Sequence, residues 1–307
     1  MKNNISLDIK IINYVNRKLD EYAIKKREKE KVRTEKFWRN NFKSSDHIIH
    51  QLDSDVKIKL YEDSILSKLI YEGFENSEID FLNAFLIEGD SFVDIGANVG
   101  LFSLYASKKV GSAGSVISFE PSRLTFNRLL ENLELNGITN VRPYKLGLSD
   151  KDEILELNVS ADGHDAWNTF VKSDDNKFSS KESVQVKSFD NFTQEYSINT
   201  DNISLVKLDV EGFEINVLNG APKLLSKENA PVFMVEFTDN NSISAGHCCH
   251  ELYKLLLQYG YSWYTYDVTR KKLNPEPMRL NYPYNNLIAV KNAADHKKIS
   301  RFITGNI

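Results

Sequence analysis

Apolar residues recur every three or four positions from residue 7 to about residue 38, a spacing that predicts a helix. The apolar stripe fades in 24–36, where most side chains are charged, so this part of the helix has little to bury. The polar segment 40–47 has the composition of a linker. We therefore predict a helical extension, 1–45, which is a solvated helix, a dimer contact or a frayed arm.

A lead-in segment, 46–90, follows this extension and is expected to pack on the core. Residues 56–63 alternate between apolar and polar, which predicts a strand with one buried face. The segments 64–74 and 77–87 have helical spacing. Each of them begins at a serine, a residue type that caps helix N-termini well, so two short capped helices are expected.

From residue 91 short apolar runs alternate with helical segments, and this rhythm predicts one α/β domain, 91–295, followed by a tail, 296–307. Strand, helix and strand in succession form parallel sheets that are covered by helices on both faces. The expected fold is thus a doubly wound, mostly parallel sheet. The predicted strands are 91–95, 115–120, 140–148, 203–209 and 231–237, and the predicted helices are 100–109, 122–137, 212–226 and 249–260.

Two regions interrupt the alternation. The excursion 150–202 separates the third and fourth strands and contains its own strand candidates, 154–159 and 184–189. Near the end of the chain, 261–268 and 286–292 are both strand-like and have no helix between them. These last two segments are therefore expected to pair in antiparallel fashion.

Composition excludes several classes of protein. With 41% hydrophobic residues the chain can build a core, yet no apolar run approaches the roughly 18 residues of a membrane span. The N-terminus lacks a secretory hydrophobic region, because polar residues interrupt it at every turn. The two cysteines, Cys248 and Cys249, are adjacent and cannot form a disulfide framework. We therefore expect a cytoplasmic protein without a transmembrane segment.

Charge is distributed unevenly along the chain. Residues 1–45 contain 13 Lys+Arg and 6 Asp+Glu, a net charge of +7, whereas the rest contains 26 and 37, a net charge of −11. The basic residues of the extension alternate with Glu and are accompanied by few aromatic residues, so we predict no nucleic-acid partner. A solvated helix with Glu–Lys pairs, or a helix that forms a homodimer, explains this pattern more simply.

The strongest chemical signal is a glycine-containing loop within 92–104. A buried strand ends in Asp-x-Gly-x-Asn-x-Gly, and a helix begins immediately afterwards. Gly96 and Gly100 allow a tight turn and a close approach of the backbone to a ligand. The first crossover of a doubly wound sheet is also where such folds bind their ligands.

Two classes of ligand bind at such loops. A dinucleotide needs a second glycine where this chain has Asn98, and its pyrophosphate would be repelled by Asp94. A cofactor with a cationic amino-acid group, such as S-adenosylmethionine, suits Asp94. Glu120 ends the second strand, where it would accept hydrogen bonds from both ribose hydroxyls of either class. The loop therefore favours S-adenosylmethionine over the dinucleotide of an oxidoreductase.

Further motifs accompany this loop in a fixed order: 94-DIGANVG-100, 119-FEPS-122, 147-GLSD-150, 164-HDAWNTF-170 and 207-KLDVEGFE-214. Together they resemble the FkbM-type S-adenosylmethionine-dependent methyltransferases. The likeness covers roughly 65–290 and leaves 1–45 outside. It implies the class I methyltransferase fold, with seven strands and an antiparallel final strand, and O-methyltransferase activity.

The resemblance also implies a cofactor site. Asp94 would orient the loop or meet the amino group of the cofactor, Glu120 would bind the ribose, and Pro121 would shape the next helix beside the adenine. The other implied contacts are Gly96, Ala97, Asn98 and Gly100 around the methionine half, and Gly147, Leu148 and Ser149 beside the adenine ring.

Methyl transfer to a hydroxyl requires an acceptor oxygen held in line with the methyl group and gains from a base that removes its proton. The candidates for this base are His164 in the excursion, Asp209 at the end of the fourth strand and Glu236 at the end of the fifth. Two of them have a structural alternative: His164 as an exposed loop residue, and Asp209 as the buried partner of Lys207.

Other residues of the same region are candidates for binding the acceptor. Trp167 and Asn168 offer a flat face and a polar group, although Trp167 also suits packing of the excursion onto the sheet. Glu211 is a third candidate, or it begins the following helix and gains from the helix dipole. Carboxylates at this edge could bind a divalent ion, but their spacing does not demand one, and we expect no obligatory metal.

These observations predict an S-adenosylmethionine-dependent O-methyltransferase that acts on a hydroxyl of a glycan, a sugar nucleotide or a secondary metabolite. Two other classes stay open. One is a nucleotide-dependent oxidoreductase with a Rossmann-like fold. The other is a non-catalytic cofactor-binding or scaffold protein.

Overall fold

The computed structural model describes residues 35–38, 40–42, 45–160, 168–171, 178–292 and 298–302. Contacts divide the chain into two units, 1–48 and 49–307. The predicted N-terminal helix lies almost wholly outside the described residues. All of the fold and the site described below belong to the second unit, apart from the first two residues of strand β1 (His47–Asp53).

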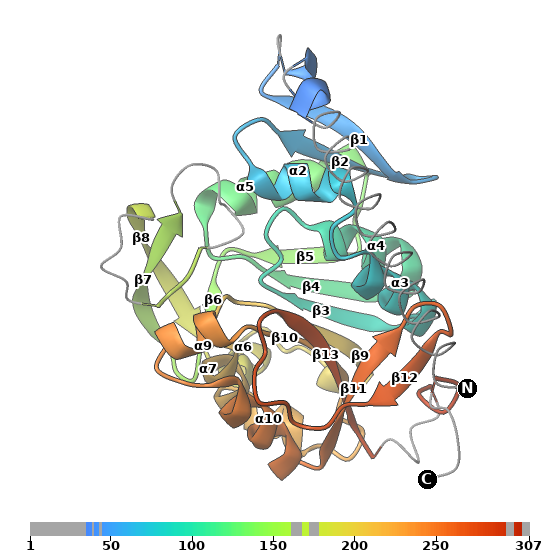
Figure 1. The fold of residues 1–307 in the computed structure, drawn as a ribbon, viewed down its shortest axis with the longest axis vertical. Helices are drawn as coiled ribbons and strands as arrows, with labels where there is room; N and C mark the ends of the chain where they lie inside the picture. The colour runs from blue at the N-terminus through green and yellow to red at the C-terminus, as the bar shows by residue number, and fades with distance from the viewer. Residues whose placement is uncertain are drawn as a thin grey trace, which may run out of the picture. The chain divides into compact units, whose positions relative to one another are not determined.

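The main sheet contains eight strands in the order β12-β11-β13-β10-β9-β3-β4-β5 (Figure 1). Parallel pairing runs from β10 through β9, β3 and β4 to β5. At the other side β13 is antiparallel to both β10 and β11, as expected for the last two predicted strands, and β12 adds an edge strand. The strands are β3 (Ser91–Ile95), β4 (Ser115–Phe119), β5 (Val141–Tyr144), β9 (Ile203–Leu208), β10 (Val232–Phe237), β11 (Tyr261–Asp267), β12 (Lys272–Pro275) and β13 (Asn285–Lys291).

Helices cover both faces of this sheet, which confirms the doubly wound arrangement. One face packs against a large apolar core that includes Phe189, Leu218, Leu224 and Leu256 from four helices. The other face contacts α4, which in turn packs on α3 (Asn76–Phe85). The helices are α4 (Leu101–Val110), α5 (Arg123–Leu135), α6 (Phe189–Glu195), α7 (Glu214–Asn219), α8 (Pro222–Ser226), α9 (Asp239–Ser244) and α10 (Cys249–Gln258).

The lead-in segment forms β1 (His47–Asp53), β2 (Val56–Tyr61), α2 (Ile65–Glu72) and α3 (Asn76–Phe85). Ser64 caps α2 as predicted, because its side chain accepts a hydrogen bond from the backbone N–H of Ser67. The prediction that Ser77 caps α3 is wrong. The N-cap of α3 is Glu75, which adopts a left-handed conformation and makes no capping hydrogen bond with its side chain.

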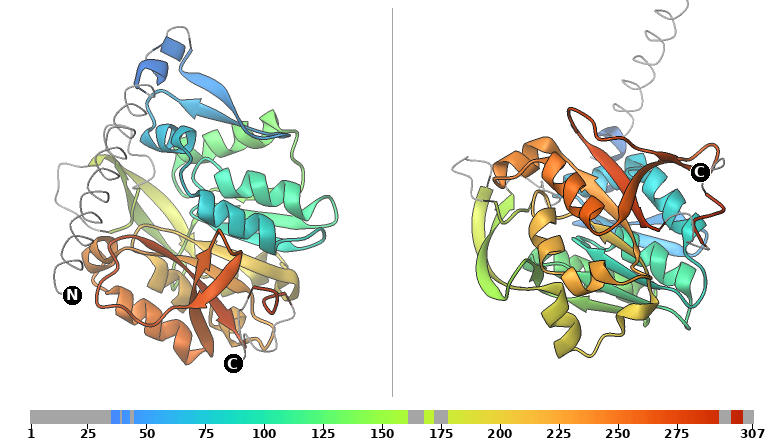
Figure 2. Two further views of the ribbon diagram at one scale, coloured as in Figure 1. Left: turned by 45° about the vertical axis from the view of Figure 1, so that its right-hand side comes forward. Right: turned by 90° about the horizontal axis from the view of Figure 1, so that it is seen from below.

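The excursion contains the two predicted strands, β7 (Glu153–Ser160) and β8 (Phe178–Lys187), which pair in antiparallel fashion beside the main sheet (Figure 2). The prediction of a single strand over 140–148 is wrong, since the chain divides into β5 and β6 (Gly147–Leu148). The pairing between β4 and β5 ends at Phe119 and Tyr144, and the chain leaves the main sheet after Tyr144. Strand β6 then pairs with the end of β8.

The prediction of one helix over 212–226 is also wrong. The chain forms α7 and α8, and Pro222 stands at the first turn of α8. Proline has no N–H and cannot continue a helix from the preceding turn, so it divides the segment. Among the described residues, no helix is long and apolar enough to cross a membrane.

Candidate functional site

The loop between β3 and α4 needs its two glycines for steric reasons. Gly96 has a φ of 83°, and a Cβ placed there would lie 1.9 Å from the carbonyl oxygen of Asp209. Gly100 has a φ of 92°, and its Cβ would lie 2.4 Å from the Cδ1 atom of Leu129. The left-handed region favours glycine, and backbone atoms cannot move aside cheaply. The loop therefore passes close to the end of β9 in a conformation that other residues at Gly96 would disturb.

Glu120, at the end of β4, is buried beneath this loop. One of its carboxylate oxygens accepts a hydrogen bond from the backbone N–H of Asn98 at 2.9 Å. The other accepts from the N–H of Ser122 at 2.9 Å and from the hydroxyl of Thr125 at 2.7 Å. Burial raises the pKa of Glu120 to about 7, although these three donors lower it. A carboxylate has about four acceptor positions, so about one remains for a ligand hydroxyl.

Asp94, the acid that precedes the loop, is fully buried. The hydroxyl of Ser103 in α4 donates a hydrogen bond to its Oδ2 atom at 2.6 Å, whereas its Oδ1 atom has no hydrogen-bond partner. Burial raises the pKa of Asp94 above its ordinary value. Asp94 is absent from the residues that line the cavity, so of its two expected roles this position suits orientation of the loop.

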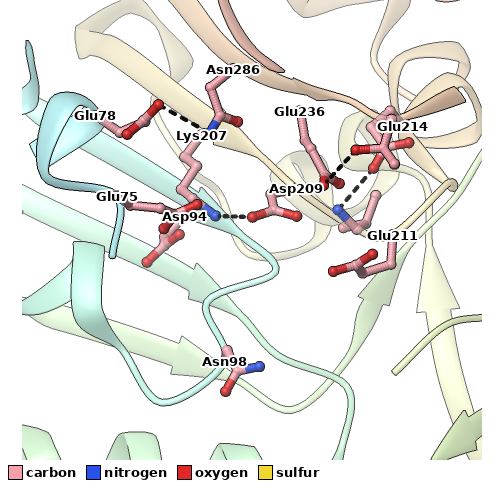
Figure 3. A network of polar contacts seen from close by, with 12 residues as sticks. Glu75, Glu78, Asp94, Asn98, Lys207, Asp209, Glu211, Glu214, Glu236 and Asn286 are labelled. Atoms are coloured by element: carbon pink, nitrogen blue, oxygen red, sulfur yellow. Dashed lines mark hydrogen bonds and ion pairs between the residues drawn. The ribbon is translucent and has the colours of Figure 1, made fainter. Parts of the chain in front are cut away.

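Lys207 forms an ion pair with Asp209, as was considered for them, but only Lys207 is buried and the Asp209 side chain is partly exposed. The Nζ atom of Lys207 lies 2.7 Å from the Oδ2 atom of Asp209 and 4.8 Å from the centre of the Phe102 ring (Figure 3). Burial lowers the pKa of Lys207, but Asp209, Glu75 and Asp94 together raise it above its ordinary value. Lys207 is therefore charged and already paired before any ligand binds.

Asp209 also belongs to a cluster of three carboxylates. Asp209, Glu211 and Glu236 each offer an oxygen, and these three oxygens lie within 4.8 Å of one another. Burial and the neighbouring carboxylates raise the pKa of Glu211 and of Glu236 well above the ordinary value. This geometry suits a divalent cation, but the ion pair with Lys207 already neutralises Asp209.

The alternative role for Glu211, as the residue that begins the next helix, is wrong. Helix α7 begins three residues later, and the Oε1 atom of Glu214 accepts hydrogen bonds from the N–H groups of Val210 and Gly212. Glu211 instead has a φ of 54° and accepts a hydrogen bond from Asn241 at 2.5 Å. Glu211 lines the cavity and remains a candidate for contact with an acceptor.

The loop after β3, Glu120, Lys207 and the three clustered carboxylates all line one cavity of about 740 Å³. Of the sequence-predicted residues, Gly100 and Ser149, like Asp94, do not line it, and His164 and Trp167 lie outside the described residues. Asn168 lines the cavity, but its side-chain oxygen accepts a hydrogen bond from the N–H of Ser160. The predicted residues that do line it are Gly96, Ala97, Asn98, Glu120, Pro121, Gly147, Leu148, Asn168, Asp209, Glu211 and Glu236.

Other lining residues were not predicted. Glu75, at the start of α3, and Tyr284, in the loop before β13, face the cavity from segments that carry no motif. Leu66 and Leu69 of α2 add an apolar wall. Only the helical spacing of 64–74 could have indicated that these two leucines turn inward.

The sheet topology, the loop and the acid at the end of β4 define a nucleoside-binding protein with a Rossmann-like fold. Residues 94–263, more than half of the chain, match the Methyltransferase FkbM domain family. The chain therefore belongs to this family, and its cofactor is S-adenosylmethionine.

The chain is also similar in sequence to individual methyltransferases. The chain is 33% identical over 147 residues to Methyltransferase 1 from Beauveria bassiana, a match that covers 43% of this chain and 58% of that protein. It is 30% identical over 142 residues to the hexuronic acid methyltransferase AglP from Haloferax volcanii, covering 46% and 54%. The chain thus spans little more than half the length of these relatives. The crystal structure of Methyltransferase FkbM from Methylobacillus flagellatus KT superposes with a TM-score of 0.43 at 15% identity, covering 67% of this chain and 47% of that one.

The residues present fit the cofactor. Glu120 can accept one more hydrogen bond, which a ribose hydroxyl can donate. Gly147 and Leu148, which are expected beside the adenine, line the cavity, and so does Gly96 of the loop that is expected around the methionine half. Asp209, Glu211 and Glu236 form an acidic wall of the cavity. This wall is complementary in charge to a cofactor that carries a sulfonium and an ammonium group.

Proposed function

We propose that this protein transfers the methyl group of S-adenosylmethionine to a hydroxyl of a glycan, a sugar nucleotide or a secondary metabolite. The observation that carries this proposal is a cluster of three acidic side chains at the ends of β9 and β10. The cluster consists of Asp209, Glu211 and Glu236. It lines the same cavity as the cofactor loop, at the edge of the sheet where the fold places its ligands. Such a wall can bind hydroxyl groups and accept a proton from one of them.

Glu236 is the base that the surroundings favour. Asp209 is paired with Lys207, and Asn241 donates a hydrogen bond to Glu211, so both of these carboxylates already have a protein partner. Glu236 is 6% exposed, and one of its oxygens accepts a hydrogen bond from Thr238 at 2.9 Å. A raised pKa makes the ionised carboxylate a stronger proton acceptor than an ordinary glutamate side chain. His164 stays a prediction for the same role.

The chemistry makes few further demands on the protein. The sulfonium of the cofactor supplies an activated methyl group. Asp209 and Glu211 would orient the acceptor hydroxyl in line with that methyl group, which is where most of the acceleration of such a displacement arises. Glu236 would remove the hydroxyl proton as the new bond forms.

The acidic wall also favours a neutral acceptor group over an anionic one. A carboxylate acceptor would stand beside three acidic side chains and would be repelled by those that are ionised. A relative named for hexuronic acid supports a sugar as the acceptor. On such a sugar we expect a hydroxyl, rather than the carboxylate, to receive the methyl group here.

Product analysis tests this proposal. The purified protein would be incubated with methyl-labelled S-adenosylmethionine and a panel of uronic acid glycans, sugar nucleotides and hydroxylated metabolites. An O-methyl ether resists mild alkali, whereas a methyl ester is hydrolysed, so the label should stay on the product. Alkali-labile label, or label on nitrogen, would refute a hydroxyl acceptor. Cofactor binding without transfer to any member of a broad panel would favour the non-catalytic alternative.

A further inference from the structure

Glu75 has a backbone conformation that its own helix does not explain. It is the N-cap of α3 with a φ of 56° and a ψ of 28°, in the left-handed region that non-glycine residues adopt only at a cost in strain. Its side chain makes no capping hydrogen bond to α3. It points into the cavity instead, where the hydroxyl of Tyr284 lies 3.4 Å from its Oε1 atom.

The charges around Glu75 leave it without a dedicated cation. Lys207 is a positive group that acts on it, but the Nζ atom of Lys207 is already 2.7 Å from the Oδ2 atom of Asp209. Asp94 also acts on Glu75, yet it does not line the cavity. Figure 3 shows Glu75 and Asp94 on one side of Lys207, and Glu236 and Glu211 on the other. At this end of the cavity wall, Lys207 and Asp209 neutralise each other, so the ionised form of Glu75 supplies the excess negative charge.

The direction of the cofactor follows from the other contacts. Gly147 and Leu148 are expected beside the adenine and Glu120 at the ribose, and all three line the cavity. The chain beyond the ribose must then cross the loop at Gly96, toward Lys207 and Glu75. The group at that far end is an α-amino acid, and of its two charged groups only the ammonium complements an extra carboxylate.

We propose that Glu75 binds the α-ammonium group of the cofactor and so selects ligands that carry the whole amino-acid moiety. The strain at Glu75 is then the cost of directing its carboxylate into the site rather than along α3. This assignment depends on the cofactor alone and not on which acceptor is methylated.

The protonation of Glu75 agrees with this role. Burial raises its pKa to about 8, Lys207 lowers it, and Asp209, Glu78 and Asp94 raise it, while the Tyr284 hydroxyl faces it from the loop before β13. A bound ammonium group would favour the charged form of this carboxyl. Cofactor binding at neutral pH should therefore release a proton from Glu75.

Calorimetry with two ligands tests the proposal. S-adenosylhomocysteine carries the ammonium group, whereas 5′-methylthioadenosine has the same nucleoside and a thioether without it. For Glu75→Gln we expect S-adenosylhomocysteine to bind at least about tenfold more weakly, as for loss of a charged hydrogen bond, with 5′-methylthioadenosine unchanged. Glu78→Gln is the matched control, because Ser77 and Asn286 bind the two oxygens of Glu78. Both ligands should bind this control as they bind the unaltered protein.

Three results would overturn the proposal: equal weakening of both ligands, no weakening of either, or weakened turnover with unchanged S-adenosylhomocysteine affinity. The first would make Glu75 a residue that shapes the cavity, and the last would place it on the acceptor. Glu75→Gly is a second variant, since glycine adopts the left-handed conformation without strain. It should fold at least as well as the unaltered protein and show the same selective loss.

Discussion

Removal of the Glu120 carboxylate should weaken cofactor binding by a predictable amount. Three protein donors occupy its oxygens, so about one acceptor position is left for a ribose hydroxyl. A hydrogen bond to a charged group contributes about 1.5–3 kcal/mol, which corresponds to a roughly 10- to 150-fold weaker Kd. Glu120→Ala also leaves the N–H of Asn98 without its carboxylate acceptor, so the loop loses an anchor and the upper part of this range is expected.

The assay is calorimetry at pH 8, above the pKa of about 7 that Glu120 has in the ligand-free protein. S-adenosylhomocysteine and 5′-methylthioadenosine both contain the ribose, so Glu120→Ala should weaken both by the same factor. Thr125→Val is the matched control, because it removes one protein donor to the same carboxylate and keeps the charge. Undiminished affinity of Glu120→Ala would refute the ribose contact. A loss confined to S-adenosylhomocysteine would place Glu120 at the amino-acid end instead.

Three further predictions concern the loop, the buried acids and the base. Gly96→Ala should destabilise the protein by more than about 3 kcal/mol in denaturant unfolding, because its Cβ would lie 1.9 Å from the carbonyl oxygen of Asp209; a native-like midpoint would show that the loop can relax. Glu120 and Glu214 have folded-state pKa values of about 7, above the ordinary 4.5, so their protonated forms favour folding. The unfolding free energy of the ligand-free protein should thus be highest below pH 4.5 and fall by an amount on the order of 3 kcal/mol per buried carboxyl as the pH rises through 7; a free energy that rises over this range would contradict it. Glu236→Gln should lower kcat by about 10²- to 10⁴-fold and leave the Kd of S-adenosylhomocysteine unchanged, whereas an unaltered pH–rate profile would move the base to His164 or Asp209.

The loop and the acid of the proposed cofactor site were predictable because their requirements are local. A glycine that must turn at φ 83° and an acid at the end of the next strand leave a mark in the sequence at fixed spacing. The doubly wound sheet was predictable for a similar reason, since each strand and helix carries its own periodicity. Even there, the boundaries depended on partners: β5 ends where β4 no longer offers a pairing residue.

The acceptor half and the amino-acid end were less accessible. Glu75 and Tyr284 come from segments more than 200 residues apart, and neither belongs to a motif. Their meeting depends on how the lead-in helices and the loop before β13 pack across the sheet edge. Likewise, the preference for Glu236 over Asp209 as base depends on the ion pair with Lys207, which only the three-dimensional arrangement shows.

A crystal structure with S-adenosylhomocysteine tests the central claim most directly. The account predicts the adenine beside Gly147, a ribose hydroxyl within hydrogen-bond distance of Glu120 and the ammonium group at Glu75. It also predicts that the sulfur faces open space bordered by Glu236, where an acceptor hydroxyl can enter. A nucleoside bound away from Glu120, or a sulfur directed into a closed wall, would contradict methyl transfer at this site.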